Sequence, residues 1–338
     1  MRKRRALLVY LGRRLGFAIA AWLFFAVLIF ALPRAIPGNP VALLLANLAQ
    51  QGQVNPELIR EVYRRFMDEF GLGLPLWQQF SQYFGRLLQG DLGTSISMFP
   101  QKVADILGTF LPWTVALLLP AVCIGWLLGN YLGALVAWKK GLDRVATPVF
   151  LTISQTPFYW FAMLVLFSFA VKLRFFPIGG TFSWGLRPAL TLDFIKDYLR
   201  HYCLPFLSLV LVSIGGWAIG MRSMMIYERR SDYVLFAEAL GLPDRYLLRY
   251  AFRSAMLPQI TGLALNFGLM LGGSLLVELV FNYRGMGSIT FQALTTLDYP
   301  LIQGIFIILS TTVIMANLVV DIVYGLVDPR IRTGFSGG

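Results

Sequence analysis

Long apolar runs alternate with shorter polar segments along most of the chain. Six runs contain no charged residue, and they cover residues 15–33, 113–138, 148–171, 202–221, 259–277 and 299–320. Each run is long enough to cross about 30 Å of hydrocarbon as an α-helix. The pattern therefore predicts an all-α, polytopic membrane helix bundle with six transmembrane helices, which places both ends of the chain on one side of the membrane.

The polar segments complete the predicted map. The first apolar run is longer than the hydrophobic part of a signal peptide and lacks a clear cleavage site, so we interpret it as an uncleaved span. The last two helices extend past their uncharged parts. The map comprises helices 15–33, 113–138, 148–171, 202–221, 259–281 and 299–326, outer segments 34–112 and 172–201, an inner loop 222–258, and the terminal segments 1–14 and 327–338.

The placement of Lys and Arg indicates the orientation of these helices. Positive charges concentrate in residues 1–14, 139–144 and 222–258, and again at Arg330 and Arg332. Short basic segments stay on the cytoplasmic side, whereas long segments such as residues 34–112 cross largely regardless of charge. The basic loop 172–201 runs against this pattern. We place both termini and the 222–258 loop in the cytoplasm, and the protein in the cell membrane.

The 222–258 loop is the longest polar interruption in the second half of the chain. Within it, Tyr233, Phe236, Ala237 and Leu240 follow helical spacing, with Ser231 at the expected N-cap. A glycine then supplies the backbone freedom that a helix C-terminus requires. The pattern predicts a short amphipathic helix that ends there.

A second short helix is predicted to start at Pro243 and to end at Pro258. Its arginines and its small apolar residues fall on separate stripes, formed by Arg245, Arg249 and Arg253 and by Leu247, Ala251 and Ala255. Two short helices joined at a glycine, between two membrane spans, make a docking surface. The alternative is an interfacial helix pair whose arginines rest on anionic lipid head groups.

The same loop resembles a known family motif. Ala237, Ala239 and Gly241, followed by residues 256–258 (Met-Leu-Pro), are similar to the EAA loop of ATP-binding-cassette importer permeases of the dipeptide/oligopeptide/nickel branch. Leu240 stands where that branch usually has a basic residue, and Tyr250 where it usually has a histidine.

Further motifs extend the resemblance over nearly the whole chain, in the family's order. Residues 37–40 resemble its Pro-Gly-Asp-Pro, residues 71–76 its Gly-Leu-x-x-Pro-Leu, and residues 90–95 its Gly-Asp-Leu-Gly-x-Ser. Residues 317–321 and 328–332 resemble its C-terminal signature.

The resemblance implies a permease subunit that forms half of the translocation pathway for short peptides. It implies a homologous second permease, two cytoplasmic ATPase subunits that carry ATP and Mg, and an external substrate-binding protein. It also implies that the ATPase contacts the inner loop, for which we select Tyr233, Phe236, Ala237, Glu238, Ala239, Gly241, Arg245 and Pro258. Related permeases serve nickel, oligosaccharides or other small solutes, and the substrate stays open among these.

Two carboxylates lie in the predicted spans. Glu278 ends the fifth span, near Phe281, and Asp321 lies in the sixth, one turn after Asn317. A carboxylate in a membrane is costly unless it is paired or faces water. Glu278 and Asp321 are therefore candidates for the pathway or its outer gate. The family resemblance adds Phe281, which follows the counterpart of Glu278, and Asn317 is included as the neighbour of Asp321. The alternatives are a solvated helix end for Glu278 and an interhelical hydrogen-bonding role for Asn317 and Asp321.

Glycines give a separate indication of how the helices pack. Gly125, Gly129 and Gly133 repeat at every fourth position of the second predicted span. Small residues at this spacing let helix backbones approach closely in lipid. We expect a packing face there, the alternative being that glycine is simply common in membrane helices.

Composition narrows the function. The chain is 57% hydrophobic and 14% charged, unlike a soluble domain, and its net charge of +12 is spread around apolar runs rather than gathered as in a nucleic-acid-binding domain. One histidine and two distant cysteines, Cys123 and Cys203, provide neither an ordinary zinc site nor a disulfide framework.

The sequence has no phosphate-binding loop and no hydrolase motif, so we expect no catalysis, cofactor or metal in this chain and energy from a partner. A secondary, ion-coupled transporter is the alternative of another class, but it would normally show inverted repeats and midplane carboxylates. A membrane enzyme would need a cluster of titratable groups at one membrane face.

Overall fold

The computed structural model describes residues 2–35, 61, 63–64, 66–67 and 70–327. The chain forms two compact units, one of residues 1–112 and 289–338 and the other of residues 113–288. The described residues are almost entirely helical, and their only β contact is an isolated antiparallel bridge between Thr94 and Lys102. The predicted all-α class is confirmed.

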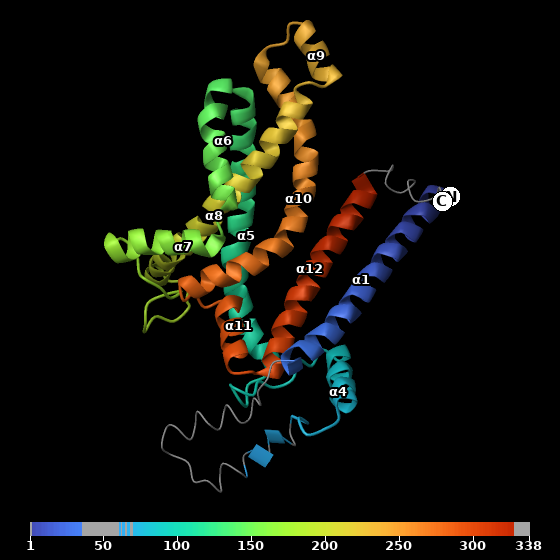
Figure 1. Ribbon diagram of the computed structural model, residues 1–338, viewed down its shortest axis with the longest axis vertical. Coiled ribbons are helices and arrows are strands. Elements are labelled where there is room, and N and C mark those ends of the chain that lie inside the picture. The colour runs from blue at the N-terminus through green and yellow to red at the C-terminus, as the bar shows by residue number, and fades with distance from the viewer. Residues whose placement is uncertain (1, 36–60, 62, 65, 68–69, 328–338) are drawn as a thin grey trace. The chain divides into compact units, whose positions relative to one another are not determined.

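The first unit is built on two long helices, α1 (Arg2–Ala35) and α12 (Tyr299–Val327), which lie side by side (Figure 1). Ala26 and Ile29 of α1 pack against Ile307 of α12. The indole Nε1 of Trp22 donates a hydrogen bond of 3.0 Å to Thr311 Oγ1. A short helix, α4 (Leu76–Leu88), completes this unit together with the start of α5 (Val103–Trp138).

The second unit contains most of α5 and the longest helices of the chain (Figure 1). Its elements after α5 are α6 (Lys140–Gln155), α7 (Phe158–Val165), the π-helix η1 (Leu166–Lys172), α8 (Leu192–Glu228), α9 (Asp232–Ala239), α10 (Asp244–Val280) and the first residues of α11 (Met286–Thr295). Its main core is apolar and includes Leu117, Ala121, Ala162, Leu204, Leu209 and Val277.

The glycine face of α5 packs against α8. A Cβ added at Gly129 would lie 2.5 Å from the Trp217 Cβ, and one at Gly125 would lie 2.5 Å from the Ser213 Oγ. A Cβ at Gly133 would overlap the backbone of Ala218. No larger side chain fits at these positions, so the predicted packing face is confirmed.

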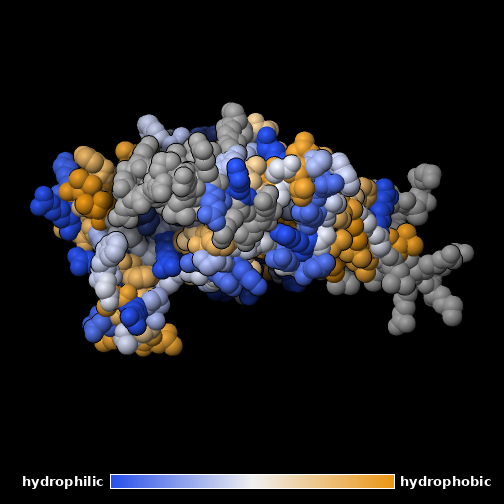
Figure 2. Space-filling model, turned by 90° about the horizontal axis from the view of Figure 1, so that it is seen from below, coloured by the Kyte–Doolittle hydropathy of each residue, from blue (hydrophilic) through white to orange (hydrophobic). Residues whose placement is uncertain are grey.

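Four described helices are long and apolar enough to cross a membrane: α1, α5, α8 and α12. The α6–α7–η1 stretch adds a fifth if its two bent parts form one span. The predicted fifth span, residues 259–281, falls in α10, whose side chains are described only in part. Many large apolar side chains stay exposed, Phe17, Phe24, Leu164 and Phe167 among them, and Figure 2 shows apolar surface beside polar surface. Such a surface is typical of a multi-pass membrane protein.

Two predicted helices, at residues 148–171 and 243–258, have other bounds in the structure. Residues 148–171 do not form one straight helix, because the chain bends by 103° between Gln155 and Phe158. Thr156, which precedes Pro157, has an extended backbone (φ −79°, ψ 125°), as residues before proline prefer. Conversely, Pro258 does not end its helix but lies inside α10.

Two predicted motifs fall outside the described residues. These are the segment at residues 37–40 and the C-terminal signature at residues 328–332.

Candidate functional site

The inner loop between α8 and α10 contains the predicted short helix as α9. Ser231 occupies the N-cap position, but its hydroxyl donates to the carbonyl of Glu228 (2.6 Å) and accepts no capping hydrogen bond from a backbone N–H of α9. After α9 the chain reverses at Gly241, whose φ is +75°. The backbone N–H groups of Gly241 and Leu242 donate to the carbonyls of Glu238 and Ala237, at 2.9 and 3.2 Å. The predicted glycine C-terminus is confirmed.

A small apolar core fixes this loop to the ends of α8 and α10. Val234 and Ala237 of α9 are buried against Met221 and Met225 of α8. The predicted apolar stripe of the next helix, formed by Leu247, Ala251 and Ala255, completes the core and is confirmed as buried. The loop is therefore a packed unit with its own core.

The predicted apolar stripe of α9 lies mostly on its exposed surface. Of its four members only Ala237 is buried, whereas Tyr233, Phe236 and Leu240 are exposed, Phe236 by 67%. The helix turns Val234 and Ala237 inward, because these two smaller side chains fit against the two methionines of α8. The larger apolar side chains are left on the outer surface.

Charged residues surround the exposed apolar surface of α9. Glu238 and Ala239 are exposed, as are the predicted arginine stripe of Arg245, Arg249 and Arg253 and the later Pro258. The guanidinium of Arg245 lies 4.9 Å from the centre of the Tyr246 ring. Exposed aromatic and aliphatic side chains on a rigid base, next to arginines, are typical of a protein-binding surface.

A bidentate ion pair ties the start of α6 to the C-terminal part of α8. Arg222 donates from Nε and Nη2 to the two carboxylate oxygens of Asp143, at 2.5 and 2.7 Å. The hydroxyl of Thr147 donates to the same carboxylate at 2.6 Å. Paired arginine hydrogen bonds fix geometry as well as charge, so this contact holds α6 and α8 in register below the loop.

Glu278 is completely buried near the end of α10. The hydroxyl of Thr114 donates to its Oε1 (2.7 Å), and the backbone N–H of Gly287 donates to its Oε2 (2.6 Å). The N–H of Met286 in turn donates to the Thr114 hydroxyl (2.7 Å). The interpretation of Glu278 as a solvated helix end is therefore wrong, because its carboxylate joins α5, α10 and the start of α11.

The other predicted pathway residues do not join Glu278 in one described site. Phe281, three residues after Glu278, is buried. The Phe281 carbonyl accepts a hydrogen bond from the Gly180 N–H (2.8 Å). Asn317 and Asp321 belong to the other compact unit. There the Asp321 carboxylate lies 3.2 Å from Nη1 of Arg14 in α1. The expected bond from this part of α12 to a neighbouring helix is confirmed for Asp321.

A polar cavity in the second unit was not predicted. It has a volume of about 530 Å³ and lies where α8 and α10 meet the bend between α6 and α7. Three side-chain amides line it, those of Gln155, Gln259 and Asn266, and none makes a hydrogen bond to a described side chain or backbone group. Gln259 and Asn266 are seven residues apart and so share a helix face.

Two signals in the sequence indicate this cavity. Pro157 lies inside an apolar run, and irregular backbone at membrane depth is tolerated only where it is buried in protein or lines a cavity. Uncharged amides recur in the neighbouring runs at residues 259 and 266. These two amides meet the amide of Gln155 only because the chain bends at Pro157.

We also searched the described side chains for ligands that could hold a metal. Within this part of the chain, no group of three or more His, Cys, Asp or Glu residues lies close enough together to hold an ion.

Comparison with known proteins places the chain in a family. Residues 121–333 match the binding-protein-dependent transport system inner membrane component. The chain is 33% identical to a di/tripeptide transport system permease protein of Pseudomonas aeruginosa, over 96% of this chain and 99% of that protein.

Two further relatives agree. A probable D,D-dipeptide transport system permease protein of Escherichia coli is 35% identical over 91% of this chain and 93% of that protein. An oligopeptide transport system permease protein of Bacillus subtilis is 29% identical over 96% of this chain and 99% of that protein. The chain thus belongs to the family of binding-protein-dependent transport system inner membrane components.

Proposed function

We propose that this chain is the permease subunit of an ATP-driven importer and forms half of a transmembrane pathway for short peptides. The names of its relatives refer to transport of dipeptides, tripeptides and oligopeptides, and the alignments cover nearly the whole chain. The observation that carries the coupling part of this proposal is the exposed apolar surface of α9 on its packed base.

The α9 surface is the proposed docking site for a cytoplasmic ATPase subunit. Tyr233, Phe236 and Leu240 present apolar area, while Glu238 and Arg245 supply charge at the rim. The core under α9 keeps the docking surface from moving independently of α8 and α10. Force applied at the surface is therefore passed to these helices.

Helix α10 is suited to carry such a movement. It runs without interruption from Asp244, beside the docking surface, to Val280. Its 37 residues correspond to a length of about 55 Å at 1.5 Å per residue. Gln259 and Asn266 in the cavity wall and Glu278 near its far end lie on this one helix. A tilt of α10 at the loop would thus move both the cavity wall and the buried Glu278.

The polar cavity is the part of this chain that we assign to the peptide pathway. A carboxamide donates and accepts hydrogen bonds, as a peptide bond does, and it carries no charge. Gln155, Gln259 and Asn266 could therefore contact the backbone of a peptide whatever its side chains. The volume lies in the range of small-molecule sites, about 300–1,000 Å³.

The full transport system would contain a second, homologous permease, two ATPase subunits that hold ATP and Mg, and an external binding protein. This chain would bind no cofactor and hydrolyse no ATP. The proposed topology has six spans with both termini and the α9 loop in the cytoplasm. Residues 34–112 would face the binding protein outside, at the cell membrane.

Substitution of Phe236 tests the docking surface. Phe236→Ala and Gly241→Val should both reduce co-purification of the ATPase and uptake of a labelled dipeptide in cells. Valine is strained at the positive φ of Gly241, although no described atom lies within 4 Å of the site of its Cβ. Phe175→Ala is the matched control, because this ring is 60% exposed but lies in the other polar loop.

The proposal predicts that Phe175→Ala keeps both activities. If Phe236→Ala and Gly241→Val retain full co-purification and full uptake, the coupling assignment is wrong. The interpretation of the loop as a helix pair resting on lipid would then replace it. Uptake of dipeptide by the chain alone in liposomes, without an ATPase, would instead indicate a secondary transporter.

A further inference from the structure

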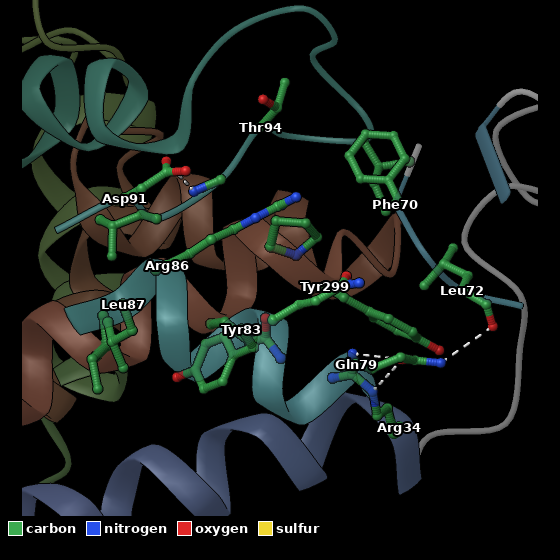
Figure 3. A pocket seen from close by; sticks show the side chains of 18 residues that line it. Arg34, Phe70, Leu72, Gln79, Tyr83, Arg86, Leu87, Asp91, Thr94 and Tyr299 are labelled. Atoms are coloured by element: carbon green, nitrogen blue, oxygen red, sulfur yellow. Dashed lines mark hydrogen bonds between the residues drawn. The ribbon is translucent and has the colours of Figure 1, made fainter. Parts of the chain in front are cut away.

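The first compact unit contains a small polar cavity of about 80 Å³ (Figure 3). Its wall combines the last turn of α1, the inner face of α4, residues 91–96 and the first two turns of α12. The residues that matter for its chemistry are Arg34, Tyr83, Arg86, Asp91 and Gln303. None of them belongs to the docking surface or to the cavity of the second unit.

Two arginines contribute to this wall, and neither has a carboxylate partner among the described residues. Arg34 donates from Nε and Nη2 to Gln79 Oε1, at 3.0 and 2.9 Å, and from Nη1 to the Phe30 carbonyl. Its guanidinium lies 3.7 Å from the centre of the Phe30 ring. Arg86 extends along the cavity in Figure 3, and no hydrogen bond or ion pair joins it to a described residue.

Two further groups in the wall are buried without a hydrogen-bond partner, Tyr83 Oη and Gln303 Nε2. Gln303 is only 7% exposed. A buried polar group without a partner costs about 1–3 kcal/mol. Burial raises the pKa of Tyr83 to about 12, so its hydroxyl keeps its proton at neutral pH and can donate.

Among the described residues that line the cavity, Asp91 is the one with a carboxylate. The Oδ1 of Asp91 accepts a hydrogen bond from the Gly93 N–H (3.0 Å). The buried carboxylate of Asp298 is engaged by the hydroxyls of Ser95 and Ser97. The described lining residues therefore carry more positive than negative charge and an excess of donors, which is the chemistry that binds an anion.

The position and size of the cavity restrict the anion. It lies at the end of α1 and the beginning of α12, two helices apolar enough to span a membrane. Leu76 and Trp77 of α4 are exposed beside it, and so is Leu32 of α1. Tryptophan and arginine are typical of the membrane interface. A volume of about 80 Å³ accepts one small group and is well below that of a drug-sized site.

We propose that this cavity binds the phosphate of a phospholipid head group at the membrane surface. Arg34 and Arg86 would neutralise the phosphate, and Tyr83 and Gln303 would donate to its oxygens. The acyl chains would lie along the exposed apolar residues of α1 and α4. The bound lipid would thereby hold α4 against the ends of α1 and α12.

Thermal unfolding of the full-length chain, purified in detergent, tests the site. The chain is titrated with short-chain phosphatidylglycerol, with diacylglycerol of the same chains, and with inorganic phosphate. We expect phosphatidylglycerol to raise the unfolding temperature and the other two to have no effect. Arg86→Gln, at an exposed position that should fold normally, should weaken the apparent affinity about tenfold, as expected for one charge-assisted hydrogen bond.

Gln303→Leu provides a second variant and Arg64→Gln the matched control. Gln303→Leu removes a buried donor without changing charge, so it should weaken lipid binding while retaining or raising the unfolding temperature without lipid. Arg64 is exposed and does not line the cavity, so Arg64→Gln should bind lipid like the unmodified chain.

Three results would overturn the proposal. Equal lipid binding by Arg86→Gln, Gln303→Leu and the unmodified chain would mean that the cavity holds only water. Equal stabilisation by inorganic phosphate would mean that the cavity binds a free anion rather than a lipid. Displacement of the lipid by a dipeptide, but not by its C-terminal amide, would assign the cavity to a substrate carboxylate.

Discussion

Two prolines in predicted membrane spans have opposite effects on their helices. Pro157 separates α6 from α7 with a bend of 103°, whereas Pro258 lies inside the continuous helix α10. Both lack the backbone N–H and both disfavour the helical conformation of the preceding residue. A proline in an apolar run therefore does not determine by itself whether the helix breaks.

The neighbours of Pro157 make the break tolerable. The hydroxyl of Ser154 donates to the Leu151 carbonyl (2.9 Å), and that of Thr156 donates to the Thr152 carbonyl (2.8 Å). The second of these bonds satisfies the Thr152 carbonyl, one of the last four of α6, which lack an i+4 partner within the helix. The polar cavity on the same side of the bend provides further room for unpaired groups.

The two residues immediately before Pro258 offer no such replacement. Met256 and Leu257 precede it, and neither can donate to a free carbonyl from its side chain. Ala255 and Ala251, about one and two turns before Pro258, are packed in the loop core. This packing fixes the direction of the helix. Loss of one backbone hydrogen bond costs less here than a break that would leave several groups unpaired.

Removal of Pro157 should have the largest effect of the changes that test this comparison. Pro157→Ala restores an N–H and frees Thr156 to become helical, so residues 140–172 should straighten and the cavity wall should be lost. We expect uptake of a labelled dipeptide to fall at least about tenfold, the equivalent of 1.4 kcal/mol, while the chain stays folded. Full uptake by this variant would show that the bend is not required.

A glycine pair in α8 tests whether packing fixes the α6 side of the bend. A Cβ at Gly215 would lie 2.8 Å from the Phe150 carbonyl oxygen and 2.9 Å from the Ser154 nitrogen, whereas one at Gly216 would meet nothing within 4 Å. Gly215→Ala should lower the free energy of unfolding by about 1–3 kcal/mol through overpacking. Gly216→Ala should leave it unchanged or raise it slightly. Equal unfolding temperatures for the two variants would contradict this packing.

The hydroxyl of Thr156 is expected to have a smaller effect. Thr156→Val keeps the shape of the side chain but removes its hydrogen bond to the Thr152 carbonyl, so stability should fall by about 1 kcal/mol. Thr156→Ser keeps a hydroxyl and serves as the control. The free energies can be compared by chemical unfolding in detergent. A loss shared by both variants would attribute the effect to packing.

Pro258→Ala should have the smallest effect on transport. The new N–H completes the hydrogen bonding of a helix that is already continuous, so the unfolding temperature should rise and uptake should change by less than about twofold. A large loss of uptake, with the ATPase still bound, would mean that the shape of α10 at Pro258 is itself needed for coupling.

Local chemistry in the sequence determined much of this protein. Apolar runs specified a helical membrane protein, and the repeat of Gly125, Gly129 and Gly133 specified where α5 meets a neighbour. The glycine at position 241 ended α9 because few other residues tolerate a positive φ. Motif order identified the family. Each of these features depends on residues that are close together in the chain.

Tertiary structure decided the features that depend on long-range contacts. It turned Val234 rather than Tyr233 and Phe236 into the loop core, because the methionines of α8 accept the smaller side chains. It buried Glu278 under Thr114 and Gly287, which no local pattern indicates. It also brought Gln155 to the amides of α10. The physical reason is that short helices and membrane carboxylates have several acceptable local states, and only packing against distant helices selects one of them.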